Sequence, residues 1–283
     1  MVDYAFTFNG YTFGGVGAPV QIMGVQGLED SPAVRAADEM RGFADGMFFG
    51  RDFLAGRTVM VDLLILAGPS GHRPVLEAMK AALTPQGGGS TAAAPLSFTL
   101  PGVSTRRIYC RLRRRSLPIT QEYTHNHASG TVEFFAGDPR IYDETASSVT
   151  INLAAKPTGL VFPLVFPLSF GGAISPNSAN AVNAGTFATK PVITIQGPVD
   201  TPVIQNATQG LSLRFNLVLG TNDILTVDTD TRAVVLNGTA SRRASLSFDS
   251  VWWDLQPGQN TILFSAAAQT TATASVMWRN AYL

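Results

Sequence analysis

The sequence predicts an all-β protein made of two β-sandwich domains, with one short helix in the first. Glycine and proline contribute 27 and 17 of the 283 residues, a turn-rich composition that favours many short strands over long helices. Apolar residues make up 45% of the chain, which is enough for a packed core. Glu disappears after Glu144, while Thr, Val, Ile and Leu become frequent. We therefore expect a first domain over residues 1–158, a second over residues 159–283 and a junction near Lys156.

Strand patterns dominate the first domain. Tyr4, Phe6 and Phe8 alternate with smaller residues and lead into Asn9-Gly10, a pair typical of hairpin turns. Residues 59–66 form a nearly continuous apolar run of strand length. Further strands are expected at residues 96–100, 108–112 and 131–135, with residues 145–157 as the last strand and the linker.

One segment of the first domain has the pattern of a helix. It opens at Pro74 and carries a single apolar stripe made of Val75, Leu76, Met79 and Leu83. It ends before Pro85 and the glycine-rich residues 87–90, for which we expect a loop.

The second domain shows strands at the spacing of a β-sandwich. Apolar residues alternate with others over residues 211–219, so one face of that strand is expected to be buried. Residues 160–168 carry two prolines and read as an edge segment that leads into this domain. Other strands are expected at residues 191–198, 224–227, 234–236, 251–253, 262–264 and 276–278, with a turn at Asn237-Gly238.

Net charge, cysteine count and the lack of targeting patterns exclude several classes of protein function. Twenty basic residues balance twenty acidic ones, which argues against a general nucleic-acid binder. Charged residues make up only 14% of the chain, against roughly 25% in ordinary soluble domains. The single cysteine, Cys110, excludes an internal disulfide and a zinc-finger spacing. We find no signal-peptide pattern and no apolar run of about 18 residues, so we expect a soluble protein made in a cytosol, without membrane insertion.

Candidate catalytic and metal-binding residues are few. His125 and His127 would share a strand face, from which they could bind a metal, but without a nearby Cys we favour solvated histidines. The third histidine is His72. Asp228 and Asp230 alternate as in a calcium loop, but no completing Glu or Gly follows, so we favour a turn capped by Asp side chains. There is no nucleophile elbow or phosphate loop. We therefore expect no enzyme activity and no cofactor.

The strongest charge feature is a run of six arginines without an acid, between residues 106 and 115. Strand alternation would place four of them on one face, namely Arg107, Arg111, Arg113 and Arg115. Like charges side by side repel each other, which favours an acidic counter-surface. That surface could be another subunit or passing DNA, and the alternative is a solvated sheet face. We take these four residues as the candidate assembly interface.

Several sequence segments resemble those of the distal tail proteins of long-tailed, non-contractile bacteriophages, in the version common among phages of actinobacteria. In the first half they are residues 48–57 (Phe-Phe-Gly-Arg-Asp-Phe-Leu-Ala-Gly-Arg) and 137–142 (Gly-Asp-Pro-Arg-Ile-Tyr). In the second half they are residues 191–198, 228–238 and 253–260. Together these segments span nearly the whole chain, in the order found in that family.

The resemblance implies a structural virion protein at the distal end of the tail, assembled in the host cytoplasm. The N-terminal domain is then expected to form a hexameric ring with a central channel, through which DNA passes without specific binding. A galectin-like C-terminal β-sandwich is expected to lie outside the ring. The implied partners are the tail tube protein, the tail-associated tip protein, and receptor-binding or other minor tail proteins.

The alternative function is a carbohydrate-binding module that adheres to the host cell wall. Such a site would use exposed aromatic side chains, for which Trp252, Trp253 and Trp278 are available. If Trp252 and Trp253 lie in one strand, they point to opposite faces, so one is core and the other is the exposed candidate.

Overall fold

The structure, a computed structural model, describes residues 4–67, 71–85, 92–119, 121–125, 127–153, 177–267 and 271–283. The chain divides into two compact units, residues 1–144 with Leu283 and residues 145–282. Within the described residues, both units are built from antiparallel strands, and α1 (His72–Ala82) is the one α-helix. The predicted fold class, mostly β with one helix in the first unit, is therefore confirmed. No helix in the described ranges has the length and apolar character needed to cross a bilayer.

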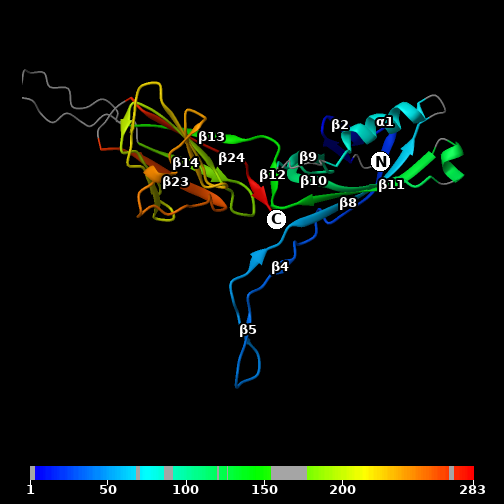
Figure 1. Ribbon diagram of the computed structural model, residues 1–283, viewed down its shortest axis with the longest axis horizontal. Helices are drawn as coiled ribbons and strands as arrows, with labels where there is room; N and C mark the ends of the chain where they lie inside the picture. The colour runs from blue at the N-terminus through cyan, green and yellow to red at the C-terminus, as the bar shows by residue number, and fades with distance from the viewer. Residues whose placement is uncertain are drawn as a thin grey trace, which may run out of the picture. The chain divides into compact units, whose positions relative to one another are not determined.

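The first unit is a curled antiparallel sheet in the order β2-β1-β9-β10-β11-β8-β3, with β12 paired to β10 (Figure 1). The strands at the two ends of this path, β2 and β3, contact each other. Phe8 of β1 also meets Phe134 of β11 edge to face, with ring centroids 5.0 Å apart, so the two halves of the sheet face one another across the core. The bounds are β1 Ala5–Phe8, β2 Tyr11–Gly14, β3 Val20–Gln26, β8 Arg57–Leu66, β9 Ala94–Thr99, β10 Arg106–Ser116, β11 His127–Ala136 and β12 Ile141–Asp143.

The predicted hairpin and the long apolar strand are both present. Asn9 and Gly10 have φ of 48° and 78°, the left-handed pair that a tight hairpin turn requires. β8 alternates buried and more exposed residues along its length, so only its inner face is core. Asp62 lies on the outer face, where its carboxylate accepts a hydrogen bond from the Thr131 hydroxyl at 2.8 Å. The acid in this apolar run is thus accommodated outside the core.

Helix α1 covers part of the same core. It begins two residues before Pro74, which fits the first turn because the amide nitrogens there need no partner inside the helix. Leu76, Met79 and Leu83 of the predicted stripe are buried. A short 3-10 helix, η1 (Gln121–His125), precedes β11. The expected glycine-rich loop at residues 87–90 lies outside the described residues.

A long arm, residues 29–55, leaves the first unit between β3 and β8. In Figure 1 it extends away from the sheet as a narrow two-stranded ribbon, where β4 and β5 are labelled. Its chain runs out through β4 (Val34–Arg35) and β5 (Glu39–Met40), and returns through β6 (Met47–Phe48) and β7 (Phe53–Leu54). β4 pairs with β7 and β5 with β6. The sequence patterns predicted no element here, because these pairings are only two residues long.

The second unit is a β-sandwich. One sheet has the order β13-β24-β15-β20-β21-β22, the other β14-β23-β17-β18, and β16 pairs with β19. Their bounds are β13 Ser147–Asn152, β14 Ser178–Asn183, β15 Val192–Gln196, β16 Val199–Asp200, β17 Val203–Asn206, β18 Leu211–Arg214, β19 Val218–Leu219, β20 Ile224–Asp228, β21 Ala233–Leu236, β22 Ala240–Ser241, β23 Gly258–Ser265 and β24 Thr273–Trp278. A 3-10 turn, η2 (Arg243–Ser245), and a last strand, β25 (Ala281–Tyr282), complete the unit.

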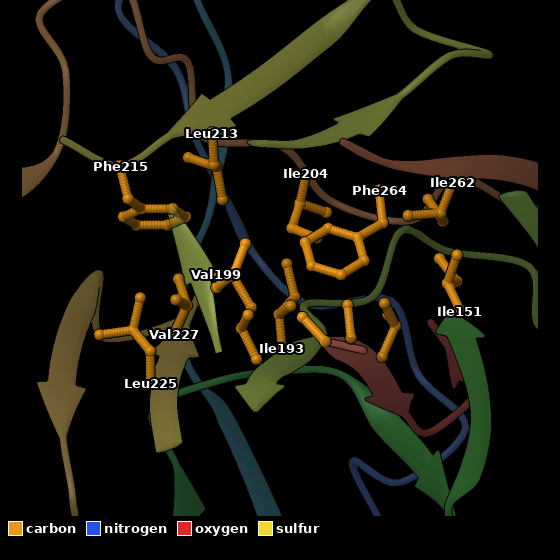
Figure 2. Close-up of a cluster of buried hydrophobic side chains, with 14 of the residues drawn as sticks. Ile151, Ile193, Val199, Ile204, Leu213, Phe215, Leu225, Val227, Ile262 and Phe264 are labelled. Carbon is orange, nitrogen blue, oxygen red and sulfur yellow. The ribbon is translucent and has the colours of Figure 1, made fainter. Parts of the chain in front are cut away.

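Apolar side chains from both sheets of the second unit meet in one core. Figure 2 shows Ile193 and Leu225 from the first sheet opposite Ile204 and Phe264 from the second. All four are fully buried. Because each sheet has one apolar face and neither can bury it alone, packing the two faces together is what makes this unit compact.

Three expectations for the second half are corrected by the structure. Residues 147–152, expected to close the first domain, form β13, which pairs with β24 and contributes Ile151 to the second core. The predicted strand over residues 211–219 is divided between β18 and β19, which lie in different sheets, although its alternating burial is present. Residues 251–253 form no strand. The expected junction near Lys156, the 158/159 boundary and residues 160–168 lie outside the described residues.

Candidate assembly interface

The arginine run lies on β10, and a bulge changes which side chains share a face. The register of β10 against β11 shifts between Leu112 and Arg114. Before the shift, Arg111 pairs with Phe135 on the outer face; after it, Arg114 pairs with Glu133 on that face. Arg115 pairs with the buried Val132, so it turns to the inner face. The predicted single face of four arginines is therefore wrong, because a bulge inserts one residue and reverses the alternation beyond it.

Three of the four candidate arginines donate hydrogen bonds inside the first unit, and those of Arg107 and Arg115 are the shortest. The Arg107 guanidinium forms a two-pronged ion pair with the Glu144 carboxylate, and this hydrogen bonding raises the pKa of Arg107. Arg115 donates to the backbone carbonyls of Lys80 and Leu83, each at 2.6 Å. These carbonyls lie at the C-terminal end of α1, where a cation complements the helix dipole. Arg107 and Arg115 therefore hold the unit together.

The other two candidates lie on the outer face. Arg111 donates from Nε to the Ala92 carbonyl at 3.2 Å. Arg113 is exposed at the bulge, and its guanidinium carbon lies 5.1 Å from the centre of the Phe135 ring. Arg114, which the prediction left out, is also exposed. We call these three arginines, with Phe135 and the neighbouring apolar residues of β8, the arginine face.

Apolar side chains lie on the same outer face. Met60 of β8 pairs with Glu133 of β11, which in turn pairs with Arg114, so methionine and arginine are two strands apart. Met60 and Leu66 are exposed, as is Met23 at the bulge of β3. The arginine face therefore combines positive charge with exposed apolar surface, a composition enriched at protein interfaces.

The arm is the second candidate surface. From residue 34 to residue 53, every residue except Asp38 is exposed. Apolar side chains that would normally be buried are among them: Val34, Met40, Phe43, Met47, Phe48, Phe49 and Phe53. Phe43 and Phe49 are essentially fully exposed, at 108% and 94%. A concentration of aromatic residues on a solvated arm marks an interaction surface.

The arm also carries a net negative charge. Residues 29–55 contain six acidic residues and three arginines. The arginines lie over the arm's own aromatic rings, with Arg35 and Arg51 both 5.4 Å from the ring centre of Phe53. The guanidinium groups of these arginines are therefore held in cation–π contacts within the arm. The acids at the tip side, Glu39 and Asp45, are left exposed.

Close backbone packing fixes the root of the arm, where its two chains join the sheet at Gly27 and Gly56. A Cβ on Gly27, whose φ is 79°, would lie 1.9 Å from the Thr58 carbonyl oxygen. A Cβ on Gly56 would lie 2.5 Å from the Phe135 ring. Both positions therefore require glycine, and they hold the two chains of the root against β8 and β11. These two close contacts determine where the arm leaves the sheet.

A buried arginine completes the root. Arg57 is 3% exposed, and its guanidinium donates to the Leu28 carbonyl, where the arm begins. Burial lowers the pKa of Arg57, and the nearby charges of Glu29 and Asp30 oppose that effect. The guanidinium thus ties the outgoing chain of the arm to the strand by which it returns.

The other predicted site residues do not assemble into a catalytic or metal site in the described part of the chain. His125 and His127 are both exposed, while His72 is buried at the start of α1 against the Tyr123 ring. No cluster of three or more His, Cys, Asp or Glu suited to a metal is found among the described residues. Cys110 is buried, which raises the pKa of its thiol to about 12.

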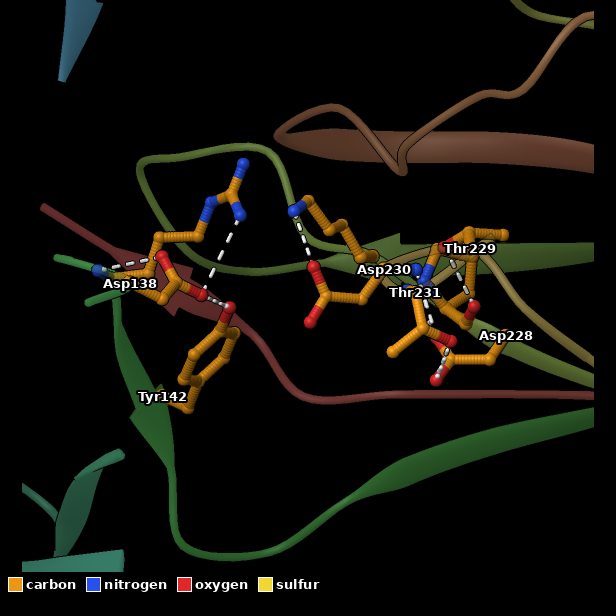
Figure 3. A network of polar contacts seen from close by, with 9 residues as sticks. Asp138, Tyr142, Asp228, Thr229, Asp230 and Thr231 are labelled. Carbon is orange, nitrogen blue, oxygen red and sulfur yellow. Dashed lines mark hydrogen bonds and ion pairs between the residues drawn. The ribbon is translucent and has the colours of Figure 1, made fainter. Parts of the chain in front are cut away.

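The Asp228 segment is the predicted turn. The Asp228 carboxylate accepts hydrogen bonds from the Asp230 amide and the Thr231 hydroxyl, each at 2.8 Å (Figure 3). Asp230 pairs with Lys190. Figure 3 also shows Asp138, which belongs to the segment at residues 137–142. Its carboxylate accepts a hydrogen bond from the Tyr142 hydroxyl at 2.6 Å. Both carboxylates stabilise local backbone structure.

The tryptophans do not form an exposed platform. Trp253 and Trp278 are buried in the second core, and the Trp278 indole donates to the Val182 carbonyl at 3.1 Å. Trp252 is half-buried, and the guanidinium carbon of Arg243 lies 4.7 Å from its ring centre. The expectation for the adjacent pair assumed a strand, which residues 251–253 do not form; Trp253 is nevertheless core, and Trp252 is partly buried and covered by an arginine.

Comparisons with known proteins place these features in a family context. Residues 184–282 match the family described as siphovirus-type tail component, C-terminal domain. No curated protein matches the sequence significantly.

Solved structures resemble the chain over its full length. The Dit protein of phage SPP1, described as a paradigm of the hub adsorption apparatus in phages that infect Gram-positive bacteria, aligns with a TM-score of 0.67 and 14% identity, covering 99% of both chains. Chains of the phage P2 baseplate in its activated conformation with calcium and with strontium align with TM-scores of 0.53 and 0.51, each at 10% identity and covering 98% of both chains. At such identities the likeness establishes the fold.

Proposed function

We propose that this chain, whose C-terminal unit carries a siphovirus-type tail component domain and whose whole length has the Dit fold, is a structural hub subunit at the distal end of a phage tail. The observation that carries the proposal is the likeness to the SPP1 protein over 99% of both chains. A match confined to one domain would allow the other to have any role. Here both units and their order along the chain correspond.

The first unit is the part that we assign to the ring. Six copies would surround a channel, join the last tube ring to the tail tip, and anchor the tail-associated tip protein with receptor-binding or other minor tail proteins. DNA would pass through the channel without specific binding. The assignment is supported by exposed apolar and charged surfaces on the first unit, which an isolated domain does not need. The second unit, residues 145–282, would be displayed outside the ring.

Labelling of intact virions tests the proposed location. Antibodies raised against the second unit should place gold at the end of the tail opposite the capsid. Electron microscopy of the same tail ends should show sixfold symmetry at that level. Label along the tube or on the capsid would contradict the assignment.

The carbohydrate-binding alternative is weaker because the expected tryptophan platform is missing. Of the three tryptophans, two are buried and Trp252 is covered by Arg243. Glycan-array binding by the full chain separates the two functions, and we expect no signal above that of an unrelated β-sandwich. Binding that is lost on Trp252→Ala would restore this alternative.

A further inference from the structure

We propose that residues 243–252 form a docking loop, by which the second unit holds an acidic segment of another tail protein. The inference rests on the proposed hub function and adds the residues and the chemistry of one attachment point. The loop includes η2 and precedes β23, and Phe248 at its tip is fully exposed. An exposed phenylalanine by itself indicates little. The way in which this loop holds it, and the charges beside it, indicate a binding role.

The backbone on both sides of Phe248 is bound to β18. The Ser247 amide donates to the Arg214 carbonyl at 2.8 Å, and the Ser250 hydroxyl accepts a hydrogen bond from the Arg214 amide at 3.0 Å. The tip itself is a tight turn, closed by a hydrogen bond from the Ser250 amide to the Ser247 carbonyl at 3.1 Å. Phe248 therefore stands on an ordered backbone, so little conformational entropy is lost when a partner covers it.

The base of the loop is closed by an aromatic contact. The guanidinium carbon of Arg243 lies 4.7 Å from the ring centre of Trp252, so the two ends of the loop meet. The Arg243 guanidinium also donates to the Arg232 carbonyl, which joins the base of the loop to the turn before β21. Arg242 directly precedes the loop. The base therefore gathers three arginines from two segments of the chain.

Positive charge at this base is not neutralised within the described part of the chain. No ion pair there involves the three exposed arginines, which are Arg232, Arg242 and Arg243. The acid on the loop, Asp249, already pairs with Arg214 at 3.4 Å. The pKa of Asp223 is lowered chiefly by a hydrogen bond from the Asn237 side chain, and less by the charge of Arg242. The three guanidinium groups are thus available to carboxylates of a partner.

An acidic protein segment fits both features of the loop. Its carboxylates would pair with the forked donors of the arginines, and its apolar side chains would cover Phe248 and the exposed Val251. Aromatic and arginine side chains are the types that contribute most to protein interfaces. A nucleic acid would use the arginines but leave Phe248 in water. A glycan would need an open aromatic platform, and Trp252 is covered by Arg243.

A photo-cross-link in intact virions tests the occupant. Phe248 is replaced by a photoreactive phenylalanine, and purified virions are irradiated and analysed by mass spectrometry. We expect a cross-link to another virion protein, at a segment where acidic residues outnumber basic ones. The matched control places the photoreactive residue at Val182, which is exposed on β14 at the opposite edge of the sheet from β18. The control should not label the same segment.

A peptide with the sequence of the labelled segment measures each feature separately. Its binding to the full chain is followed by fluorescence anisotropy at low salt. Phe248→Ala, and the double variant Arg232→Glu with Arg242→Glu, should each weaken binding by about tenfold or more. Arg232→Lys with Arg242→Lys keeps the charge and should bind much more tightly than the Glu variant. Added salt should weaken binding to the wild-type chain, because it screens exposed charges.

Several outcomes overturn the proposal: no cross-link from the Phe248 position to another virion protein, or a cross-link to a neutral or basic segment or to a second copy of this chain. Peptide binding that either Phe248→Ala or the double Glu variant leaves unchanged also overturns it. If gold still labels the distal tail end in these cases, the proposed function stands and the docking loop alone is rejected. Gold elsewhere on the virion rejects the hub function, whatever the cross-link shows.

Discussion

Replacing Phe215 by alanine tests the core of the second unit. The Phe215 side chain is fully buried among residues of both sheets (Figure 2). Removing a buried phenylalanine costs about 3–5 kcal/mol, because transfer energy is lost and the cavity collapses only partly. The matched control is Phe248→Ala, since Phe248 in the same unit is fully exposed at 106%. Its change should stay within about 0.5 kcal/mol.

Tryptophan fluorescence during urea unfolding measures this difference on the full chain. All three tryptophans, Trp252, Trp253 and Trp278, lie in the second unit, so the signal reports on that unit alone. With a urea dependence of about 2 kcal/mol per molar, a loss of about 4 kcal/mol lowers the midpoint by about 2 M. The reasoning is refuted if Phe215→Ala leaves the midpoint unchanged or if both variants shift it equally.

Three further predictions concern the unit boundary, the arginines and the cysteine. A fragment of residues 145–283 should unfold cooperatively when expressed alone, whereas residues 159–283 should be less stable, because that fragment lacks β13 and its Ile151; equal midpoints in urea would place β13 outside the folding unit. Arg115→Gln should weaken the end of α1 and cost the first unit about 1 kcal/mol of stability, which calorimetry would detect as a lower thermal midpoint. Arg113→Gln should leave that midpoint unchanged and reduce assembly. Cys110 should resist thiol reagents at neutral pH, since burial raises its pKa to about 12, and react once the chain unfolds; rapid labelling of the native chain would show that β10 opens.

Local patterns identified many of the strands correctly. Asn9-Gly10 and Asn237-Gly238 both adopt the positive φ values expected of their turns, because few other residues adopt that backbone conformation without strain. The alternation over residues 211–219 correctly predicted which side chains are buried, even though the backbone is divided between two sheets. Burial follows the period of the side chains, whereas hydrogen-bond partners depend on segments distant in the sequence.

The candidate interface was only partly predictable. The arginine run was visible, but the bulge at Leu112 was not, so Arg115 was placed on the wrong face and Arg114 was left out. The arm was missed because each of its paired segments is only two residues long. The segment at residues 48–57 contains three phenylalanines close to charged residues. That mixture is unusual for a core strand, and it was the one sequence pattern that could have indicated an exposed arm.

The sequence by itself determined the fold class, the single helix and the two-part organisation, since these follow from composition, turn residues and side-chain period. Only the tertiary structure decided where the units divide: β13 joins the second unit because its apolar face completes that core and its backbone pairs with β24. It also decided which arginines are structural, because a one-residue bulge reverses the faces of a strand. Most of all, it decided that residues 34–53 remain exposed, since whether an apolar side chain is buried depends on what the rest of the chain can bring against it.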